Sequence, residues 1–243
     1  MEPGDLTDAE LSRSIADEAG AMLLRIQEEG ADGARGDREA NALILGRLRA
    51  ARPGDAILSE ESADDPIRLS RSRVWIVDPL DGTREFGESR ADWAVHVALA
   101  VNGVAAAGAV ALPRLGCTLS SDVPPVLAGG HLPPRMLVSR TRPSALCADV
   151  GARIGAEHIG MGSAGAKAMA VVRGEAEIYL HSGGQHQWDN CAPVAVALAA
   201  GLHCSRIDGS PIVYNQPGTS IPDLLICRPE WSQIVLESVA NCI

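Results

Sequence analysis

Two aspartates that follow an apolar run are the residues best suited to chemistry in this chain. Residues 74–77, Val-Trp-Ile-Val, predict a short buried strand, and Asp78 and Asp81 come after it, separated by a proline and a leucine. The proline and Gly82 favour a stiff, tight loop that would hold both acids. The acids can converge on one hard cation, while N–H groups around Gly82 and Thr83 can face an anion. This combination is the one expected for metal-assisted hydrolysis of a phosphate ester.

The same segment has a plainer interpretation. Asp, Pro and Gly all favour turns, so an isolated Asp-Pro-x-Asp-Gly sequence is better explained as a turn without chemistry. The chemical interpretation therefore depends on further acids that the fold would bring to the same place.

Other acids stand where predicted elements begin or end. Glu60 and Glu61 follow a short predicted strand at residues 56–59, and Asp37 and Asp189 stand at the predicted starts of two helices. If the two strands are neighbours, the acids at their ends meet. Each acid also has a structural interpretation, because Glu60 and Glu61 can begin a solvated segment and the two aspartates can serve as N-caps.

A glycine-rich junction in the second half can hold an anion. Residues 160–167 join a predicted strand to a predicted helix, whose N-terminus attracts negative charge, and Lys167 adds a positive charge. The spacing is not that of a P-loop, and an ordinary turn capped by Ser163 is the alternative. His181 and His186 are five residues apart without further Cys or His partners, which is a weak pattern for zinc.

The order of predicted elements indicates an α+β first half and an α/β second half. Two helices, at residues 7–29 and 37–51, are separated by a flexible glycine-rich loop and precede several strands. Two apolar runs around Asn102-Gly103 predict a hairpin. Strands then alternate with helices after the proline-rich residues 131–134, which are the best candidate for a domain boundary. The chain would divide into domains 1–134 and 135–243.

Composition narrows the class of protein. A chain of 243 residues with 46% hydrophobic and 21% charged residues is of ordinary globular composition. The formal net charge of −10 argues against nucleic-acid polymers and acidic membranes as partners. No apolar run reaches the roughly 18 residues that span a membrane, and no signal-peptide pattern is present. Six scattered cysteines without a CxxC motif predict reduced thiols and a cytoplasmic protein.

Three segments resemble the signatures of the inositol monophosphatase family. They are Glu60-Glu61, the DPLDGT sequence at residues 78–83 and the WDNCAP sequence at residues 188–193, and their order and spacing fit along essentially the whole chain. The resemblance implies the layered αβαβα sandwich of the inositol monophosphatase and fructose-1,6-bisphosphatase type. It also implies a lithium-sensitive phosphatase that uses two or three Mg²⁺ ions.

The resemblance further implies a role for each matching residue. The implied metal ligands are Glu60, Asp78, the backbone carbonyl of Leu80, Asp81 and Asp189, and Asp37 is a candidate lid residue or ligand of a third ion. The implied catalytic residues are Glu60, Thr83 and Asp81, with Glu60 and Thr83 orienting the attacking water. The backbone amides of Gly82 and Thr83 would bind the phosphate. The loop before Asp37 departs from the family pattern, since it lacks the lysine, serine and threonine that relatives carry there.

Weaker cues resemble the CysQ branch, whose members remove the 3′-phosphate of 3′-phosphoadenosine 5′-phosphate (PAP) in sulfur assimilation. The cues are residues 83–86, 162–167 and 208–211 and the pair Tyr214-Asn215. The expected substrate is PAP, or its sulfated form. Inositol 1-phosphate or fructose 1,6-bisphosphate as substrate, and a catalytically silent regulator that binds metal or nucleotide, stay open as alternatives. A homodimer is also open. The candidate nucleotide contacts are Ser163, Lys167, Tyr179 and Tyr214, and both tyrosines have core packing as the alternative.

Overall fold

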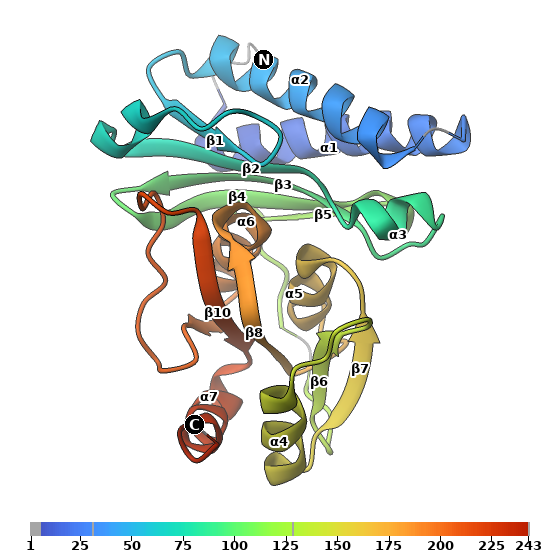
Figure 1. Ribbon diagram of the computed structural model, residues 1–243, viewed down its shortest axis with the longest axis vertical. Helices are drawn as coiled ribbons and strands as arrows, with labels where there is room; N and C mark the ends of the chain where they lie inside the picture. Colours follow the sequence, from blue (N-terminus) through green and yellow to red (C-terminus); the bar gives the residue numbers. More distant parts are fainter. Residues whose placement is uncertain (1–5, 31, 128, 243) are drawn as a thin grey trace.

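The computed structural model describes residues 6–30, 32–127 and 129–242, which form five layers in the order helices, sheet, helices, sheet, helices (Figure 1). The expected αβαβα sandwich is thereby confirmed. The outer helices on one side are α1 (Asp8–Glu28) and α2 (Gly33–Ala51), those between the sheets are α5 (Ala164–Val172) and α6 (Gln187–Ala199), and those on the other side are α4 (Ala145–Ile154) and α7 (Pro229–Ala240).

Helix α1 begins with a capping box formed by Thr7 and Glu10. The Thr7 hydroxyl accepts a hydrogen bond from the Glu10 backbone N–H, and the Glu10 carboxylate accepts one from the Thr7 N–H at 2.8 Å. These two bonds satisfy N–H groups that a helix start leaves free.

Helix α2 starts earlier than expected. Its N-cap is Asp32, whose side chain accepts from the Arg35 N–H, so the interpretation of Asp37 as a cap and of residues 33–36 as a loop was wrong. The glycines of this turn serve close packing. A Cβ on Gly36 would lie 3.0 Å from the Leu23 side chain of α1, and one on Gly33 would collide with Thr83. Glycine here therefore lets two elements approach, which sequence alone does not distinguish from flexibility.

The first sheet carries the predicted hairpin. Asn102 and Gly103 both have positive φ, 51° and 80°, as a two-residue turn between antiparallel strands requires. In spatial order the strands are β1 (Ala56–Ser59), β2 (Arg73–Asp81), β3 (Ala94–Val101), β4 (Val104–Leu112) and β5 (Cys117–Ser120), with only β1 and β2 parallel. Three short helical segments connect these strands: η1 (Pro66–Ser70) between β1 and β2, α3 (Thr83–Gly87) after β2, and η2 (Pro113–Leu115) after β4.

The second sheet is mixed, and its strands alternate with helices as predicted. Its spatial order is β7 (Glu157–Met161), β6 (Arg135–Ser139), β8 (Ile178–His186), β10 (Ser220–Cys227) and β9 (His203–Ser205). Helices α5 and α6 come from this half of the chain but share one apolar cluster with the first sheet, including Ile76, Ala98 and Val196. The division at residue 134 therefore stays a prediction, because the middle layer belongs to both sheets. None of the helices in the described ranges is long and apolar enough to cross a membrane.

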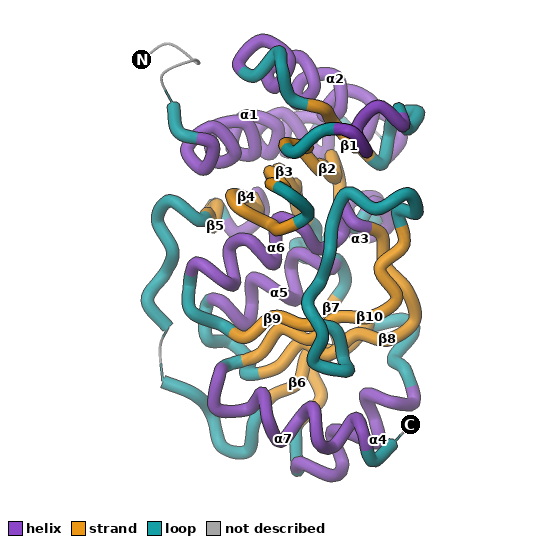
Figure 2. The backbone as a smooth tube through the Cα atoms, turned by 90° about the vertical axis from the view of Figure 1, so that its left-hand side faces the viewer, coloured by secondary structure: helices purple, strands orange, loops and turns teal. Residues whose placement is uncertain are grey.

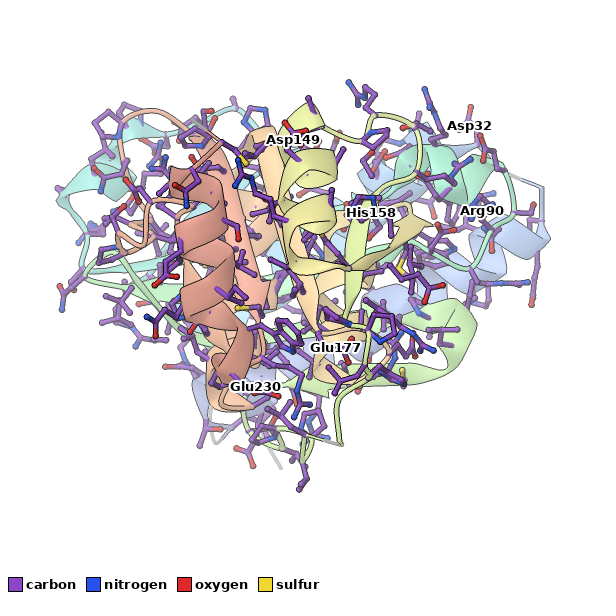
Figure 3. The ribbon with its side chains drawn as sticks, turned by 90° about the horizontal axis from the view of Figure 1, so that it is seen from below. Asp32, Arg90, Asp149, His158, Glu177 and Glu230 are labelled. Carbon is purple, nitrogen blue, oxygen red and sulfur yellow. The ribbon has the colours of Figure 1, made fainter. Side chains whose placement is uncertain are left out.

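Glu177 ties the connection between the two sheets to the start of β8. Its carboxylate has no exposed surface and accepts hydrogen bonds from the backbone N–H groups of His131, at 2.9 Å, and Arg135, at 2.7 Å. Figure 3 labels it in the view from the α4 and α7 side. Burial alone would raise the pKa of this carboxyl, but the donors from Arg135 and His131 outweigh burial and lower the pKa.

We expect Glu177→Gln to lower the free energy of unfolding at pH 7 by about 2 kcal/mol, because charge-assisted hydrogen bonds are lost. The lowered pKa means that the carboxylate stabilises the fold above its ordinary pKa and loses this effect as pH falls through the folded-state value. Urea unfolding across pH should therefore show the difference between the two proteins shrinking on the acid side.

Glu175→Gln is the matched control, since Glu175 is half exposed and pairs with Arg173 at the surface. It should change stability by no more than about 0.5 kcal/mol. A Glu177→Gln protein as stable as this control would contradict the anchoring role.

Candidate active site

Asp78 and Asp81 lie at the end of β2, where its pairing with β3 is irregular. The register shifts between the two acids, which pair with His96 and Ala94 respectively. Both remain part of the strand, so the expectation that they lie on a loop after it was wrong. The strand ends at Asp81. The next residue is Gly82, whose φ of 95° lies in the left-handed region, and a Cβ there would lie 3.2 Å from the Trp93 side chain. The bulge and the glycine together hold both acids at one edge of the sheet.

Glu60 joins these acids because β1 runs parallel to β2. Ser59 pairs with Val77, and the Glu60 N–H donates to the Val77 carbonyl at 3.3 Å, so Glu60 emerges beside Asp78. Burial raises the pKa of Glu60 above its ordinary value. Burial raises the pKa of Asp78 well above its ordinary value, and the charges of Asp81 and Glu60 raise it further. The predicted meeting of acids from neighbouring strands is present in the structure.

Asp37 approaches the same place from the inward face of α2. Its side chain is only 8% exposed, and the Thr83 hydroxyl lies 3.5 Å from Asp37 Oδ2 and 3.2 Å from the Leu80 carbonyl. Burial, followed by the charges of Glu61 and Glu60, raises the pKa of Asp37 to about 7. Asp37 therefore reaches the acid cluster from a rigid helix.

Asp189 reaches the cluster from the first turn of α6. It occupies the third helical position, where its Oδ2 accepts from the His186 N–H at 2.7 Å. It is thus part of a capping box whose N-cap is His186, and the interpretation of Asp189 itself as the N-cap was wrong. Burial raises its pKa to about 7, with Asp81 the largest charged contributor.

Asp81 differs from its neighbours because donors surround it. Its carboxylate accepts from the Ser163 hydroxyl at 2.5 Å and from the Gly165 N–H at 2.6 Å, at the start of α5. His96 Nε2 lies 3.2 Å away, while His96 Nδ1 donates to the Trp188 carbonyl at 2.9 Å. Burial alone would raise the pKa of Asp81, but His96, Ser163 and Gly165 outweigh it and lower the pKa to about 2. Asp81 therefore stays ionised among acids that resist ionisation.

The chemistry of these side chains fits a hard cation. In the part of the chain that the structure describes, no three metal-binding side chains already converge tightly enough to hold an ion. The donors are nevertheless all oxygens, and Asp78, Asp37 and Asp189 have raised pKa values through burial and mutual repulsion. Positive charge placed among them would relieve that repulsion, and Mg²⁺ prefers such carboxylate oxygens together with water.

A cavity of about 320 Å³ opens beside the acids. Its wall includes Asp81, Gly82 and Asp189 at the acid cluster and Ser163, Lys167 and Tyr179 from α5 and β8. Positively charged side chains also line the cavity, those of Arg84, Arg140, Arg142 and Lys167. The structure thus brings six of the twelve sequence-predicted site residues to one hollow.

Lys167 contributes to the wall in an unexpected way. Only 5% of it is exposed, and its ammonium group donates to the carbonyls of Gly162, at 3.1 Å, and Ser163, at 2.5 Å. It also lies 5.4 Å from the centre of the Tyr179 ring. Burial lowers the pKa of Lys167. Two of its three donors are therefore used to fix the turn that leads into α5.

Tyr214 does not line this cavity. It is 1% exposed, and its hydroxyl donates to Asn190 Oδ1 at 2.9 Å inside the middle layer. The expectation that Tyr214 contacts the substrate was wrong, and the alternative of core packing with a satisfied hydroxyl holds.

Several cavity and site residues were missed from the sequence. His96 stands inside an apolar strand, and a lone histidine in such a run was the one signal available. Arg140 and Arg142 follow β6 in a loop without a motif, and Arg140 is held by Glu85 at 2.7 Å and Glu88 at 3.1 Å. Such pairs across the fold cannot be found from spacing along the chain.

With this geometry in place, comparison with known proteins decides the family. The model of the inositol monophosphatase family matches residues 12–123 and 131–242. The chain belongs to this family. Curated relatives include a protein from Mycobacterium leprae named 3′-phosphoadenosine 5′-phosphate phosphatase, 49% identical over 96% of this chain and 93% of that protein. Another is the 3′(2′),5′-bisphosphate nucleotidase CysQ of Escherichia coli strain K12, 30% identical over 74% of this chain and 78% of that protein.

Solved structures share the fold of this family member. CysQ from Bacteroides thetaiotaomicron superimposes with a TM-score of 0.76 at 24% identity, covering 89% of this chain and 95% of that one. An inositol monophosphatase from Anabaena has a TM-score of 0.77 at 20% identity, covering 96% and 95%. At these identities the likeness establishes the architecture alone.

We expect Gly165→Ala to impair the site, because a Cβ there would collide with the His96 ring that faces Asp81. An exposed helical Gly→Ala change normally stabilises a protein, whereas this one should cost about 1–3 kcal/mol through overpacking. Displacement of Asp81 or the start of α5 should lower kcat/KM by about a hundredfold. Urea unfolding and steady-state phosphate release measure the two effects.

Gly160→Ala is the control, since a Cβ at Gly160 would meet nothing closer than 3.5 Å. It should leave both quantities nearly unchanged. A Gly165→Ala protein with raised stability and full turnover would show that the close contact with His96 is unimportant.

Proposed function

We propose that this protein hydrolyses the 3′-phosphate of PAP to give AMP and inorganic phosphate, with Mg²⁺ as cofactor. The observation that carries the proposal is that one cavity joins the acid cluster to several cationic side chains. The acids suit metal ions that receive the phosphate to be cleaved, and the cations suit a second anionic group. A nucleotide with two phosphates supplies both.

The number of phosphates separates PAP from inositol 1-phosphate. A monophosphate would use the acid end and leave Arg140 and Arg142 with a polyol, whereas PAP carries its 5′-phosphate as a second partner for guanidinium groups. The names of the curated relatives from Mycobacterium leprae and Escherichia coli agree with a bisphosphate nucleotide substrate. The sulfated form of PAP carries the same 3′-phosphate and is a second substrate under this proposal.

The chain's own residues would divide the work as follows. Glu60, Asp78, Asp81 and Asp189, with the Leu80 carbonyl, would hold two Mg²⁺ ions, and Asp37 would assist a third. The bound metal would supply positive charge that activates water and stabilises the leaving oxygen. Thr83 and Glu60 would orient the attacking water, and the backbone amides of Gly82 and Thr83 would bind the phosphate. His96 keeps Asp81 ionised, because its charge favours the carboxylate form.

The cysteines agree with a cytoplasmic enzyme of sulfur assimilation. All six are free thiols in the structure, and burial raises the pKa of Cys191, Cys204 and Cys227, which makes these thiols unreactive. Reduced, buried thiols are usual in a reducing compartment.

The direct test measures phosphate release from PAP, inositol 1-phosphate and fructose 1,6-bisphosphate in parallel, with Mg²⁺ and with or without Li⁺. We expect the highest kcat/KM for PAP and inhibition by Li⁺. Preference for fructose 1,6-bisphosphate or inositol 1-phosphate would overturn the nucleotide assignment and leave the metal site standing. Release from none of them would favour the silent regulator.

We also expect Asp78→Asn to separate activity from stability. The change removes a buried charge that Asp81 and Glu60 repel, so the free energy of unfolding measured in EDTA should not fall. Loss of a ligand should nevertheless lower kcat by about a thousandfold or more. Phosphate release and urea unfolding provide the two measurements.

Asp81→Asn provides the contrast, because Asp81 accepts hydrogen bonds that an amide nitrogen cannot accept. This variant should lose both turnover and stability. If Asp78→Asn kept full activity, the assignment of the acid cluster as a catalytic metal site would be wrong.

A further inference from the structure

Four buried polar side chains form one continuous chain of hydrogen bonds that ends at the substrate cavity. The Tyr214 hydroxyl donates to Asn190 Oδ1 at 2.9 Å, and Asn190 Nδ2 donates to Gln185 Oε1 at 3.1 Å. Gln185 Nε2 then donates to the Tyr179 hydroxyl at 2.9 Å. Each of the four is at most 7% exposed. We call this set the tyrosine relay.

The relay has a direction. Each donor points from Tyr214 towards Tyr179, so the Tyr179 oxygen accepts a hydrogen bond from Gln185 and its own O–H must donate elsewhere. Tyr179 and Gln185 both line the cavity. Burial, with the charges of Asp81 and Asp189, raises the pKa of Tyr179 well above its ordinary value, so the hydroxyl keeps its proton. Hydrogen bonds in such a chain also strengthen one another.

The far end of the relay is anchored to the first sheet. The Tyr214 N–H donates to the carbonyl of Gly103 in the β3–β4 turn at 2.9 Å. The neighbouring Asn215 N–H donates to Gln187 Oε1 at 2.6 Å, and its side chain accepts from the buried Arg68 at 3.0 Å. The segment between β9 and β10 thus runs along the side of the molecule from the second sheet to the first (Figures 1 and 2).

We propose that the tyrosine relay fixes the Tyr179 hydroxyl as a hydrogen-bond donor to an anionic oxygen of the bound substrate. Tyr214, Asn190 and Gln185 are positioning residues that act only through Tyr179. An acceptor oxygen is the required partner, because the Tyr179 oxygen already accepts from Gln185 and its O–H is left to donate. The cationic side chains that also line the cavity favour an anionic acceptor. The inference rests on the proposed function only for the identity of that substrate, PAP.

A double-mutant cycle tests the relay, since residues that act through one another are not additive. Tyr179→Phe should raise the KM for PAP about fivefold and leave kcat within about twofold, as loss of one hydrogen bond predicts. Tyr214→Phe should raise KM by a smaller factor, about threefold. The double variant should be no worse than Tyr179→Phe alone. If the rises in KM of the two single variants multiplied in the double variant, the two residues would act independently and the proposal would be overturned.

Val239→Ala controls for lost stability. Val239 is 1% exposed in the apolar cluster beneath the second sheet, so its truncation destabilises the fold away from the cavity. The KM for PAP should stay unchanged in this variant. If KM rose equally in Val239→Ala and in Tyr214→Phe, the role of Tyr214 would be merely structural.

A second measurement does not depend on turnover. The chain has only two tyrosines, so protein labelled with 3-fluorotyrosine should give two ¹⁹F resonances. Removing the Tyr214 hydroxyl should shift the remaining resonance of Tyr179, while Val239→Ala should not. An unshifted resonance would overturn the relay. If wild-type protein released no phosphate from PAP, the proposed function would fail and this spectrum alone would decide the relay.

Discussion

The structure is organised around the repulsion among buried carboxylates. Asp78 is fully buried, and Glu60, Asp81 and Asp189 all disfavour its ionisation. Such a cluster costs stability unless protons or cations neutralise it. A protein that only needed to fold would place apolar residues there, so the cluster indicates a function that depends on attracting positive charge. This constraint connects the fold with the proposed metal site and the proposed anionic substrate.

The fold imposes this proximity through rigid elements. Glu60 and Asp78 are neighbours because β1 and β2 are parallel and in register, and the first turn of α6 brings Asp189 from the middle layer. Asp81 is the exception that keeps its charge, since the N-terminus of α5 and His96 surround it with donors. The cluster therefore contains acids poised at different pKa values, an arrangement typical of catalytic sites.

Much of this arrangement was predictable from local pattern. Apolar runs and the Asn102-Gly103 turn predicted the hairpin, and the acids at the ends of two strands predicted the cluster. The predictions failed where tertiary contacts override local preference. The glycines before Asp37 allow helix packing where a loop was expected, and Tyr214 pairs with Asn190 inside the core. The guanidinium groups of Arg140 and Arg142 reach the cavity from a loop whose path depends on the whole second sheet. The spacing of residues along the chain does not predict the path of that loop.

The most direct test of the central claim is thermal unfolding of the wild-type protein in EDTA and at rising Mg²⁺ concentrations. Any ion that binds the folded state alone raises the unfolding midpoint, by about 1.4 kcal/mol of stability for each tenfold excess over its dissociation constant. Because the acids repel one another, the account predicts a clear, saturating rise with Mg²⁺. A midpoint that does not respond to Mg²⁺ at any concentration that supports phosphate release would contradict it.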